Sequence, residues 1–370
     1  MQHVRIGIIG LGSMGSIHAK YFAEGRVARA ELTAVADTRI GQLTVPAGAQ
    51  PFAKVADLLG SGLVDAVLIA TPHYFHVDAG IAALKAGLHV LVEKPLAVHK
   101  ADCERLLAAH TNPRQVFAEM FQLRTVPCYQ RIRQMIQSGE LGAVRRLNWI
   151  ITDWYRTNAY YASGGWRATW AGEGGGVLLN QCPHNLDLWQ WMFGMPRAVR
   201  GFCQLGRYHA IEVEDDVTAY FDYADGATGV FITSTGEAPG TNRLEIAGEN
   251  GRLVLETGKL TFLRNEVPMT EFSRASAKMF GRPPATAQEI TVAEGGGQHV
   301  EIHQNFVDAI LDGVPLIAPA AEGIRSVELA TAILYSALNG RTVELPLDSA
   351  AYERFLQNLI RQSKSGQRQP

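Results

Sequence analysis

Two groups of side chains in this sequence are suited to acid–base chemistry on a bound small molecule. Lys94 follows an apolar run of strand length and precedes Pro95, whose fixed φ holds the turn. Asn180, His184 and Asp187 follow a run of three glycines. His184 and Asp187 share one face of a predicted helix, and a histidine beside a carboxylate is a natural general base or acid near neutral pH. We expect Lys94 to donate to a ligand oxygen and His184 to move a proton.

A simpler interpretation exists for each group. A solvated loop lysine, or a histidine that caps or packs at a helix start, would show the same residue types. The strand-end position favours a role for Lys94, whereas the segment around His184 does not decide by itself. His299 and His303 have a spacing that would suit a metal ion, but no third ligand is near. We interpret this pair and Glu301 as a helix surface or interdomain contact, and we predict no metal site.

The segment that would hold a ligand beside these groups begins at residue 4. An apolar run over residues 4–9 leads into a turn with three spaced glycines, Gly10, Gly12 and Gly15. A helix follows, and the next apolar run ends on Asp37. This order binds dinucleotides: the glycines allow a tight turn, close approach of the pyrophosphate and close helix packing, and the helix N-terminus receives the phosphates. A turn without a ligand is the alternative.

The acid at the end of the second run bears on cofactor choice. Asp37 would accept hydrogen bonds from the adenosine ribose and would repel a 2′-phosphate, which favours NAD over NADP. Arg39 lies two residues further on and could instead bind that phosphate.

Strands and helices alternate up to about residue 124. Buried strands are predicted over residues 65–70, 88–92 and 115–119, and helices over residues 74–86 and 99–110. This alternation predicts an α/β fold with a parallel, doubly wound Rossmann sheet whose ligand lies beyond the carboxyl ends of the strands. The residues at such ends are Thr71, Pro72, His73 and Lys94.

The pattern changes after about residue 125. A helix is predicted over residues 127–137, a long strand over 145–155, a long loop over 281–298, and helices over 299–312 and 321–338. Six further strands, two pairs of them joined by tight turns, are predicted over 198–205, 216–223, 227–234, 242–247, 252–256 and 259–264. We predict a Rossmann domain over residues 1–124, an α+β substrate-binding and oligomerisation domain with a large, open, mostly antiparallel sheet over 125–345, and a C-terminal segment over 346–370 whose polar end, 362–370, frays.

Composition narrows the class of protein. The 370 residues are 47% hydrophobic and 19% charged, which suits a two-domain α/β protein. A net charge of −2 argues against nucleic acid, and no apolar run is long enough to span a bilayer. The first strand starts too early to leave room for a signal peptide, and the four cysteines show no CxxC spacing. We therefore expect reduced thiols and a cytoplasmic location.

Four features together resemble the glucose-fructose oxidoreductase / inositol dehydrogenase / MocA family. They are the glycine turn at residues 10–15, Ala-Thr-Pro at 70–72, Glu-Lys-Pro at 93–95, and the glycine run that leads to His184 and Asp187. The resemblance covers most of the chain. It implies an NAD- or NADP-dependent enzyme in which Lys94 contacts the reacting oxygen and His184 is the acid or base. The family commonly has an aspartate where Asn180 stands, and an amide cannot take a proton, which leaves this task to His184 with Lys94.

The resemblance also implies the rest of the site. The expected substrate-binding residues are Asn180, Arg167, Trp166, Asp187, Tyr155 and Arg156. Tyr155 and Arg156, together with Tyr160 and Asp153, are the weaker choices, which ordinary interdomain packing would explain nearly as well. The expected cofactor-binding residues are Gly10, Gly12, Ser13, Met14, Asp37, Thr38, Arg39, Thr71, Pro72, His73, His76, Glu93 and Lys94.

These observations lead to one expected function and two alternatives. We expect an NAD-dependent oxidoreductase that oxidises a secondary hydroxyl of a sugar, anhydrosugar or cyclitol, or reduces the keto form. A neutral polyol is favoured because no motif for a substrate phosphate or carboxylate stands out. An NAD-retaining glycosidase of the same family and a non-catalytic cofactor-binding regulator are the alternatives. A homodimer or homotetramer through the second sheet is expected.

Overall fold

The apolar runs of the first third of the chain pair as a six-stranded parallel sheet. In the computed structural model, which describes residues 2–364, the strand order is β3-β2-β1-β4-β5-β6. The strands are β1 (Val4–Ile9), β2 (Ala30–Ala36), β3 (Gln50–Phe52), β4 (Ala66–Ile69), β5 (His89–Val92) and β6 (Phe117–Glu119). All four residues of β4 are buried, as expected for a strand covered on both faces. The predicted parallel Rossmann sheet is confirmed.

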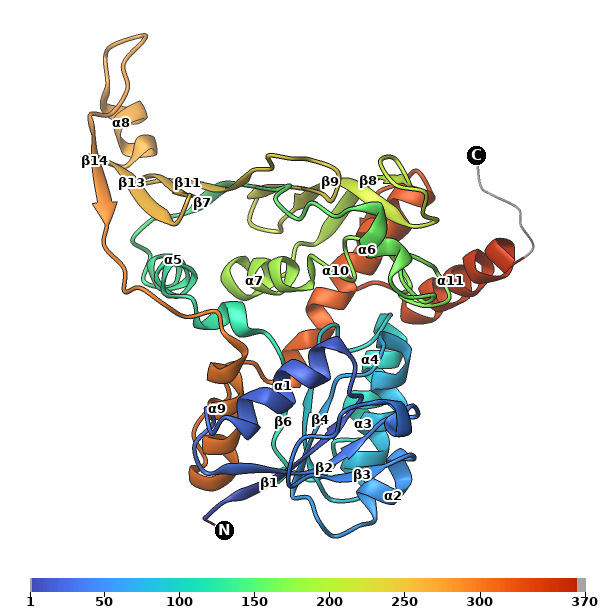
Figure 1. Ribbon diagram of the computed structural model, residues 1–370. Coiled ribbons are helices and arrows are strands. Elements are labelled where there is room, and N and C mark those ends of the chain that lie inside the picture. The colour runs from blue at the N-terminus through green and yellow to red at the C-terminus, as the bar shows by residue number, and fades with distance from the viewer. Residues whose placement is uncertain (1, 365–370) are drawn as a thin grey trace.

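Helices cover both faces of this sheet (Figure 1). One face packs against α1 (Ser13–Ala23) and α9 (His299–Asp312), and the other against α2 (Val55–Leu59), α3 (His76–Lys85) and α4 (Lys100–Ala108). Short 3-10 helices are η1 (Ile40–Gln42), η2 (His73–Phe75) and η3 (Gln122–Thr125). Phe306 and Val307 of α9 share a core with Val4 of β1. A late segment, which the predicted limits placed in the second domain, therefore completes the core of the first.

The second sheet has nine strands in the order β14-β13-β12-β11-β7-β10-β9-β8-β15. Its strands are β7 (Val144–Ile151), β8 (Ala198–Leu205), β9 (Glu214–Asp222), β10 (Thr228–Ser234), β11 (Asn242–Gly248), β12 (Gly251–Glu256), β13 (Lys259–Asn265), β14 (Ala285–Ile290) and β15 (Val343–Glu344). Only the β7–β10 pair is parallel among the described pairs. The prediction of a large, mostly antiparallel sheet is confirmed, and so are the hairpins that join β9 to β10 and β11 to β12.

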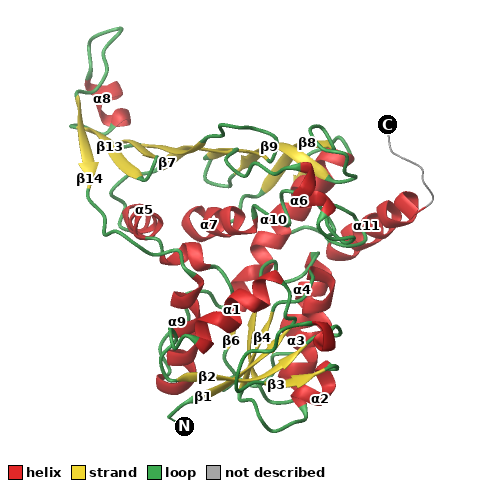
Figure 2. Cartoon of the chain, in the orientation of Figure 1, coloured by secondary structure: helices red, strands yellow, loops and turns green. Residues whose placement is uncertain are grey.

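Helices α5 (Pro127–Gln137), α7 (Pro183–Phe193) and α10 (Ala320–Leu338) lie along one face of the second sheet, between it and the first domain (Figure 2). Helix α10 contributes Val327 to the core of the first domain and Ile333 to that of the second, so it joins the two. Helix α6 (Asn158–Ala162) and helix α11 (Ser349–Lys364) flank this layer. No described helix is long and apolar enough to cross a membrane.

Several elements escape the sequence pattern. The segment expected to be a loop over residues 281–298 contains β14, and α8 (Met269–Ala275) precedes it. Five of the six residues of β14 are exposed, so it has no apolar alternation and forms through backbone pairing with β13. Strand β3 and helices α2 and α11 were also not predicted, and most of the predicted frayed tail lies outside the described residues. All four cysteines are free, as expected.

Candidate active site

The glycine turn after β1 has the close contacts that its spacing predicts. Gly10 has a φ of 91°, and a Cβ on Gly15 would lie 1.9 Å from the Gly10 carbonyl oxygen. A Cβ on Gly12 would meet nothing within 4 Å, so open space lies beside the N-cap of α1. Ser13 and Met14 form the first turn of that helix. The turn therefore combines tight packing with free space where backbone N–H groups are available to a phosphate.

Asp37 lies directly after β2 and beside the glycine turn. Its Oδ2 accepts the Leu11 N–H at 2.9 Å and its Oδ1 accepts the Arg39 N–H at 2.8 Å, across the turn that contains Thr38. The Arg39 side chain is 63% exposed and lies 3.8 Å from the carboxylate. Asp37, which is predicted to accept hydrogen bonds from the ribose, is thus held at the expected strand end, and Arg39 lies on the solvent side of its carboxylate.

The turns after β4 and β5 are tied together by a histidine. Nδ1 of His76 lies 2.8 Å from the Pro95 carbonyl oxygen, and Nε2 lies 2.8 Å from that of Thr71, where Pro72 follows. Both ring nitrogens are therefore engaged by the protein, and His76 braces the turns where we had expected a cofactor ligand. Thr71 Oγ1 and His73 Nδ1 are buried at the same edge without a hydrogen-bond partner among the described residues.

A buried chain of side chains lies behind the Lys94 turn. Glu93 accepts the Lys94 N–H at 3.1 Å, and its other oxygen lies 2.7 Å from His18 Nε2. His18 Nδ1 is 2.9 Å from His303 Nε2. Burial opposes ionisation of Glu93, but the hydrogen bond with His18 lowers the pKa of Glu93 below its ordinary value. Glu93 therefore faces the protein interior, where we had expected a cofactor contact.

This chain also explains the two histidines of α9. His303 is buried against His18 and Phe22 of α1, and the His299 ring lies 5.2 Å from that of His18. They join α9 to α1 inside the first domain, which differs from both the helix surface and the interdomain contact given above. Glu301 accepts the Thr125 hydroxyl at 2.5 Å. Within the described residues no three His, Cys, Asp or Glu side chains are grouped to hold a metal.

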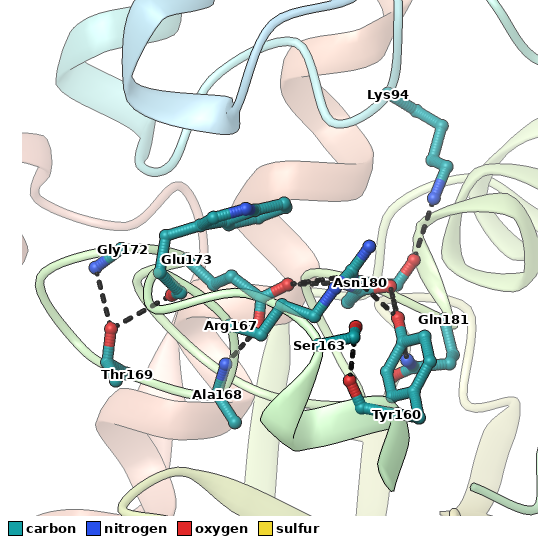
Figure 3. Close-up of polar contacts among 11 residues, drawn as sticks. Lys94, Tyr160, Ser163, Arg167, Ala168, Thr169, Gly172, Glu173, Asn180 and Gln181 are labelled. Atoms are coloured by element: carbon teal, nitrogen blue, oxygen red, sulfur yellow. Dashed lines mark hydrogen bonds and ion pairs between the residues drawn. The ribbon is translucent and has the colours of Figure 1, made fainter. Parts of the chain in front are cut away.

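Lys94 crosses from the first domain to the second. Its Nζ donates to the Asn180 backbone carbonyl at 2.8 Å (Figure 3). Burial lowers the pKa of Lys94, the charges of Glu93 and Glu173 oppose this, and Arg167 adds to it. The lysine is thus a half-buried donor at the edge of the parallel sheet, as predicted.

His184 lies in the first turn of α7, directly after Pro183, with which the helix begins. The ring is buried, Nε2 lies 3.4 Å from Gln122 Nε2, and Nδ1 has no partner in the described part of the chain. Burial, followed by the nearby Lys94 charge, lowers the pKa of His184 to about 3. The imidazole is therefore neutral at physiological pH. The histidine–carboxylate pair expected from the sequence is not formed, because the Asp187 carboxylate accepts hydrogen bonds from Arg124 and His184 Nδ1 has no partner in the described residues.

Asp187 forms a buried ion pair with Arg124 of η3. Arg124 Nε and Nη2 donate to the two carboxylate oxygens at 2.7 and 2.6 Å, and each side chain is 1% exposed. Arg124 also pairs with Glu322 of α10, and Gln190 donates to Asp187 at 2.9 Å. Asp187 therefore anchors the helix that carries His184 through its contacts with Arg124 and Gln190, and its predicted contact with the substrate stays a prediction.

Asn180 lies in a polar network of second-domain loops (Figure 3). Its Oδ1 accepts the Tyr160 hydroxyl and Gln181 Nε2, both at 3.1 Å, and its Nδ2 donates to Glu173 in a short hydrogen bond. Arg167 donates to the Tyr160 oxygen at 2.9 Å. The carbonyl oxygen of this amide is thus already occupied, and one N–H remains for another acceptor.

The remaining expected substrate residues divide into two sets. The Trp166 ring lies edge-on to His73 at 5.6 Å, which places it at the cofactor edge with Arg167 stacked on it. Arg156 donates to the carbonyls of Trp154 and Tyr155. In contrast, the weaker choice Asp153 accepts from Asn242 of β11, and Tyr155 is half exposed, so neither contacts the lysine among the described interactions.

Buried polar atoms that lack partners lie near Lys94 and His184, which are close enough for the lysine charge to lower the pKa of the histidine. Among the described residues they are Thr71 Oγ1, His73 Nδ1, Gln122 Oε1 and His184 Nδ1. Such orphaned groups are costly unless a ligand or water satisfies them, so this edge fits a polar cofactor and substrate. Gln122, Glu173 and Arg124 were missed by sequence reasoning. The one local signal that could have indicated Glu173 is its position directly before the glycine run.

Comparison with known proteins agrees with this geometry. Residues 4–142 match a family described as oxidoreductases with an NAD-binding Rossmann fold, and residues 129–254 match the Gfo/Idh/MocA C-terminal domain. The chain belongs to the Gfo/Idh/MocA family of oxidoreductases. The family resemblance drawn from the sequence is thereby confirmed, and the first domain is an NAD-binding one.

Relatives with an assigned activity are distant. An inositol 2-dehydrogenase of Corynebacterium glutamicum is 32% identical over 40% of this chain, and the match spans 44% of its length, less than half. A levoglucosan dehydrogenase of Pseudarthrobacter phenanthrenivorans is 24% identical over 95% of this chain and 100% of its own. The WlbA dehydrogenase of Bordetella pertussis, solved with NADH and UDP-GlcNAcA, has a TM-score of 0.78 at 26% identity and covers 94% of this chain and 100% of its own.

Proposed function

We propose that this oxidoreductase uses NAD to oxidise a secondary hydroxyl of a sugar, anhydrosugar or cyclitol, or reduces the corresponding ketone. The observation that carries the proposal is the proximity of Lys94 to His184, close enough for its charge to act on the imidazole, among unpartnered polar atoms at the carboxyl edge of the Rossmann sheet. Inositol 2-dehydrogenase and levoglucosan dehydrogenase among the relatives support this substrate class.

The glycine turn and Asp37 would hold the dinucleotide, and Thr71 and His73 would satisfy their free polar atoms on it. NAD, when bound, supplies the hydride acceptor for the substrate carbon. Asp37 supports NAD over NADP because its carboxylate is held in place by the N–H groups of Leu11 and Arg39.

The chain's own residues then handle the substrate oxygen. Lys94 Nζ donates to that oxygen and stabilises the negative charge that develops on it. His184 is neutral, so its imidazole is able to take the hydroxyl proton, with Lys94 beside it. Trp166, Arg167 and Asn180 supply stacking and polar contacts to the ring of the substrate.

The test is an assay of the purified chain with sugars, cyclitols and anhydrosugars, each with NAD and with NADP. A dehydrogenase accumulates reduced cofactor with at least one of them and prefers NAD. Release of a free sugar without net NADH would identify an NAD-retaining glycosidase instead. Tight NAD binding without turnover of any compound would favour a cofactor-binding regulator.

We further propose that the second sheet joins copies of this chain in a homodimer or homotetramer. Phe202 of β8 pairs with Thr218, and Val230 of β10 with Tyr220, which places these side chains on the face opposite the helices. Phe202 is 56% exposed and Tyr220 44%. Analytical ultracentrifugation that gives only a monomer at micromolar concentration would refute the assembly.

A further inference from the structure

Glu173 is a buried carboxylate that no step above uses. It is 2% exposed, and it lies between the Trp166–Arg167 loop and the glycine run. Its Oε2 accepts the Ala168 N–H at 2.5 Å and its Oε1 accepts the Asn180 Nδ2–H. Burial raises the pKa of Glu173, and the hydrogen bonds from Ala168 and Asn180 oppose this. Because both oxygens accept hydrogen bonds, the geometry suits the ionised form, which has no proton to donate.

The contacts of Asn180 lead from this carboxylate to the lysine. Glu173 accepts from Nδ2, so the amide oxygen must face Tyr160 and Gln181. The backbone carbonyl of the same asparagine receives Lys94 Nζ. Glu173 therefore orients Asn180, the residue whose backbone carbonyl accepts the hydrogen bond from Lys94 Nζ.

Glu173 is also one of few negative groups that face Lys94. The charged and titratable groups around the amine are Glu93 of its own turn, Glu173, Arg167 and Arg156 of the second-domain loops, the Cys182 thiol, and the imidazoles of His73, His76, His184 and His299. Glu93 is already hydrogen-bonded to His18 and Arg167 lies 3.9 Å from Glu173. Loss of the Glu173 charge would leave Lys94 among two guanidinium groups in a buried setting.

We propose that Glu173 is a positioning residue of this site, which holds Asn180 as the support of Lys94 and keeps the lysine positively charged by its own negative charge. The inference rests on the proposed function, in which Lys94 acts on the substrate oxygen. The family commonly has an aspartate where this chain has Asn180. Here the negative charge lies one hydrogen bond further away, on Glu173, so the site keeps a carboxylate beside this position.

The direct test is the titration of Lys94 in the cofactor-free chain. The sequence has only eight lysines, so their amines can be labelled by reductive methylation with carbon-13 and followed by NMR, with Lys94→Arg to assign the signal. In Glu173→Gln we expect the pKa of Lys94 to fall by about one pH unit or more, since a nearby opposite charge shifts a pKa by about 1–3 units. The alkaline limb of the pH profile of kcat/KM, where a lysine that must stay protonated loses its charge, should move in the same direction.

Glu212→Gln is the matched control. Glu212 accepts the Trp170 N–H at 2.6 Å in the same loop, and it is not among the groups that influence Lys94. This variant should titrate as wild type. The exchange Glu173→Gln with Asn180→Asp keeps one hydrogen bond and one negative charge in the pair, so it should restore the Lys94 titration and fold even where the single variant does not.

Two results would overturn the proposal: a Lys94 titration in Glu173→Gln equal to that of wild type, or an equal shift in Glu212→Gln. Absence of restoration in the folded double variant would also contradict it. A shift confined to Glu173→Gln in a chain that oxidises no polyol would support the Glu173 assignment while the proposed function fails, so the two are separable.

Discussion

The buried pair of Asp187 and Arg124 gives the most sharply defined prediction. In Asp187→Asn the neutral amide replaces a carboxylate that accepts two guanidinium donors and Gln190, at 2.6, 2.7 and 2.9 Å. Removing one partner of a buried ion pair typically costs roughly 3–5 kcal/mol. Arg124 keeps Glu322 and the Ile317 carbonyl, so we expect the lower end, about 3 kcal/mol.

Urea unfolding followed by circular dichroism would measure this loss. A change of about 3 kcal/mol corresponds to roughly a hundredfold shift in the folding equilibrium. Asp222→Asn is the control, because Asp222 forms the same kind of pair with Arg197 at the surface, where the two side chains are 35% and 65% exposed. A surface pair is worth about 0–1 kcal/mol, so the control should be nearly as stable as wild type.

The same variant decides between two roles for Asp187. If the residue only anchors α7, the folded variant keeps its KM for the polyol while its stability falls. Equal stability of the two variants, together with a raised KM in Asp187→Asn alone, would refute the structural role and restore the substrate contact that the sequence suggested.

Three other substitutions test separate parts of the account. Lys94→Ala should lower kcat by about a hundredfold or more while NAD still binds, since positioned acid–base groups typically contribute at least that factor; stopped-flow or steady-state rates with a binding titration measure both. Asp37→Ala should weaken NAD binding and relax the preference towards NADP, measured as a ratio of kcat/KM values. Glu119→Gln should become more stable than wild type as pH rises from 5 to 8, measured by thermal unfolding.

The direction of the expected pH dependence of stability in Glu119→Gln follows from the surroundings of Glu119. Its side chain is fully buried and both oxygens lack a partner among the described residues, so burial, and then the charge of Asp187, raise the pKa of Glu119 well above its ordinary value. The folded state therefore keeps a proton that the unfolded state loses above its own pKa. Wild type loses up to about 1.4 kcal/mol per pH unit in that window, and the neutral glutamine does not.

Contrary outcomes are equally definite. Retained turnover in Lys94→Ala would remove the proposed mechanism. An unchanged cofactor ratio in Asp37→Ala would show that another group selects NAD. A constant stability difference between Glu119→Gln and wild type across pH 5 to 8 would mean that the carboxyl group is not held protonated in the fold.

The sequence identified the cofactor-binding edge because its signals are local. Strand, glycine turn, helix and acid follow one another within forty residues, and the contacts of Gly10 and Gly15 are with that same segment or the neighbouring strand end. The turn of Lys94 is local in the same sense. Helical spacing likewise placed His184 and Asp187 on one helix, and α7 begins at Pro183 as expected.

The spacing of residues along a helix does not reveal which side chains from other segments they contact. The partner of Asp187 comes from η3 and that of His18 from α9, and both arrive through long-range packing. Strand β14, with five exposed residues, carried no pattern because backbone pairing alone holds it.

Sequence alone thus determined the Rossmann sheet and the family, and it singled out the lysine and the histidine that we propose to act on substrate, since each inference depends on the short-range order of residue types. Only the tertiary structure decided which partner each buried carboxylate has. Asp187 pairs with Arg124, Glu93 is hydrogen-bonded to His18, and Glu173 accepts from Asn180. Buried charges must find partners in three dimensions, and the chain supplies them from segments that no local pattern connects.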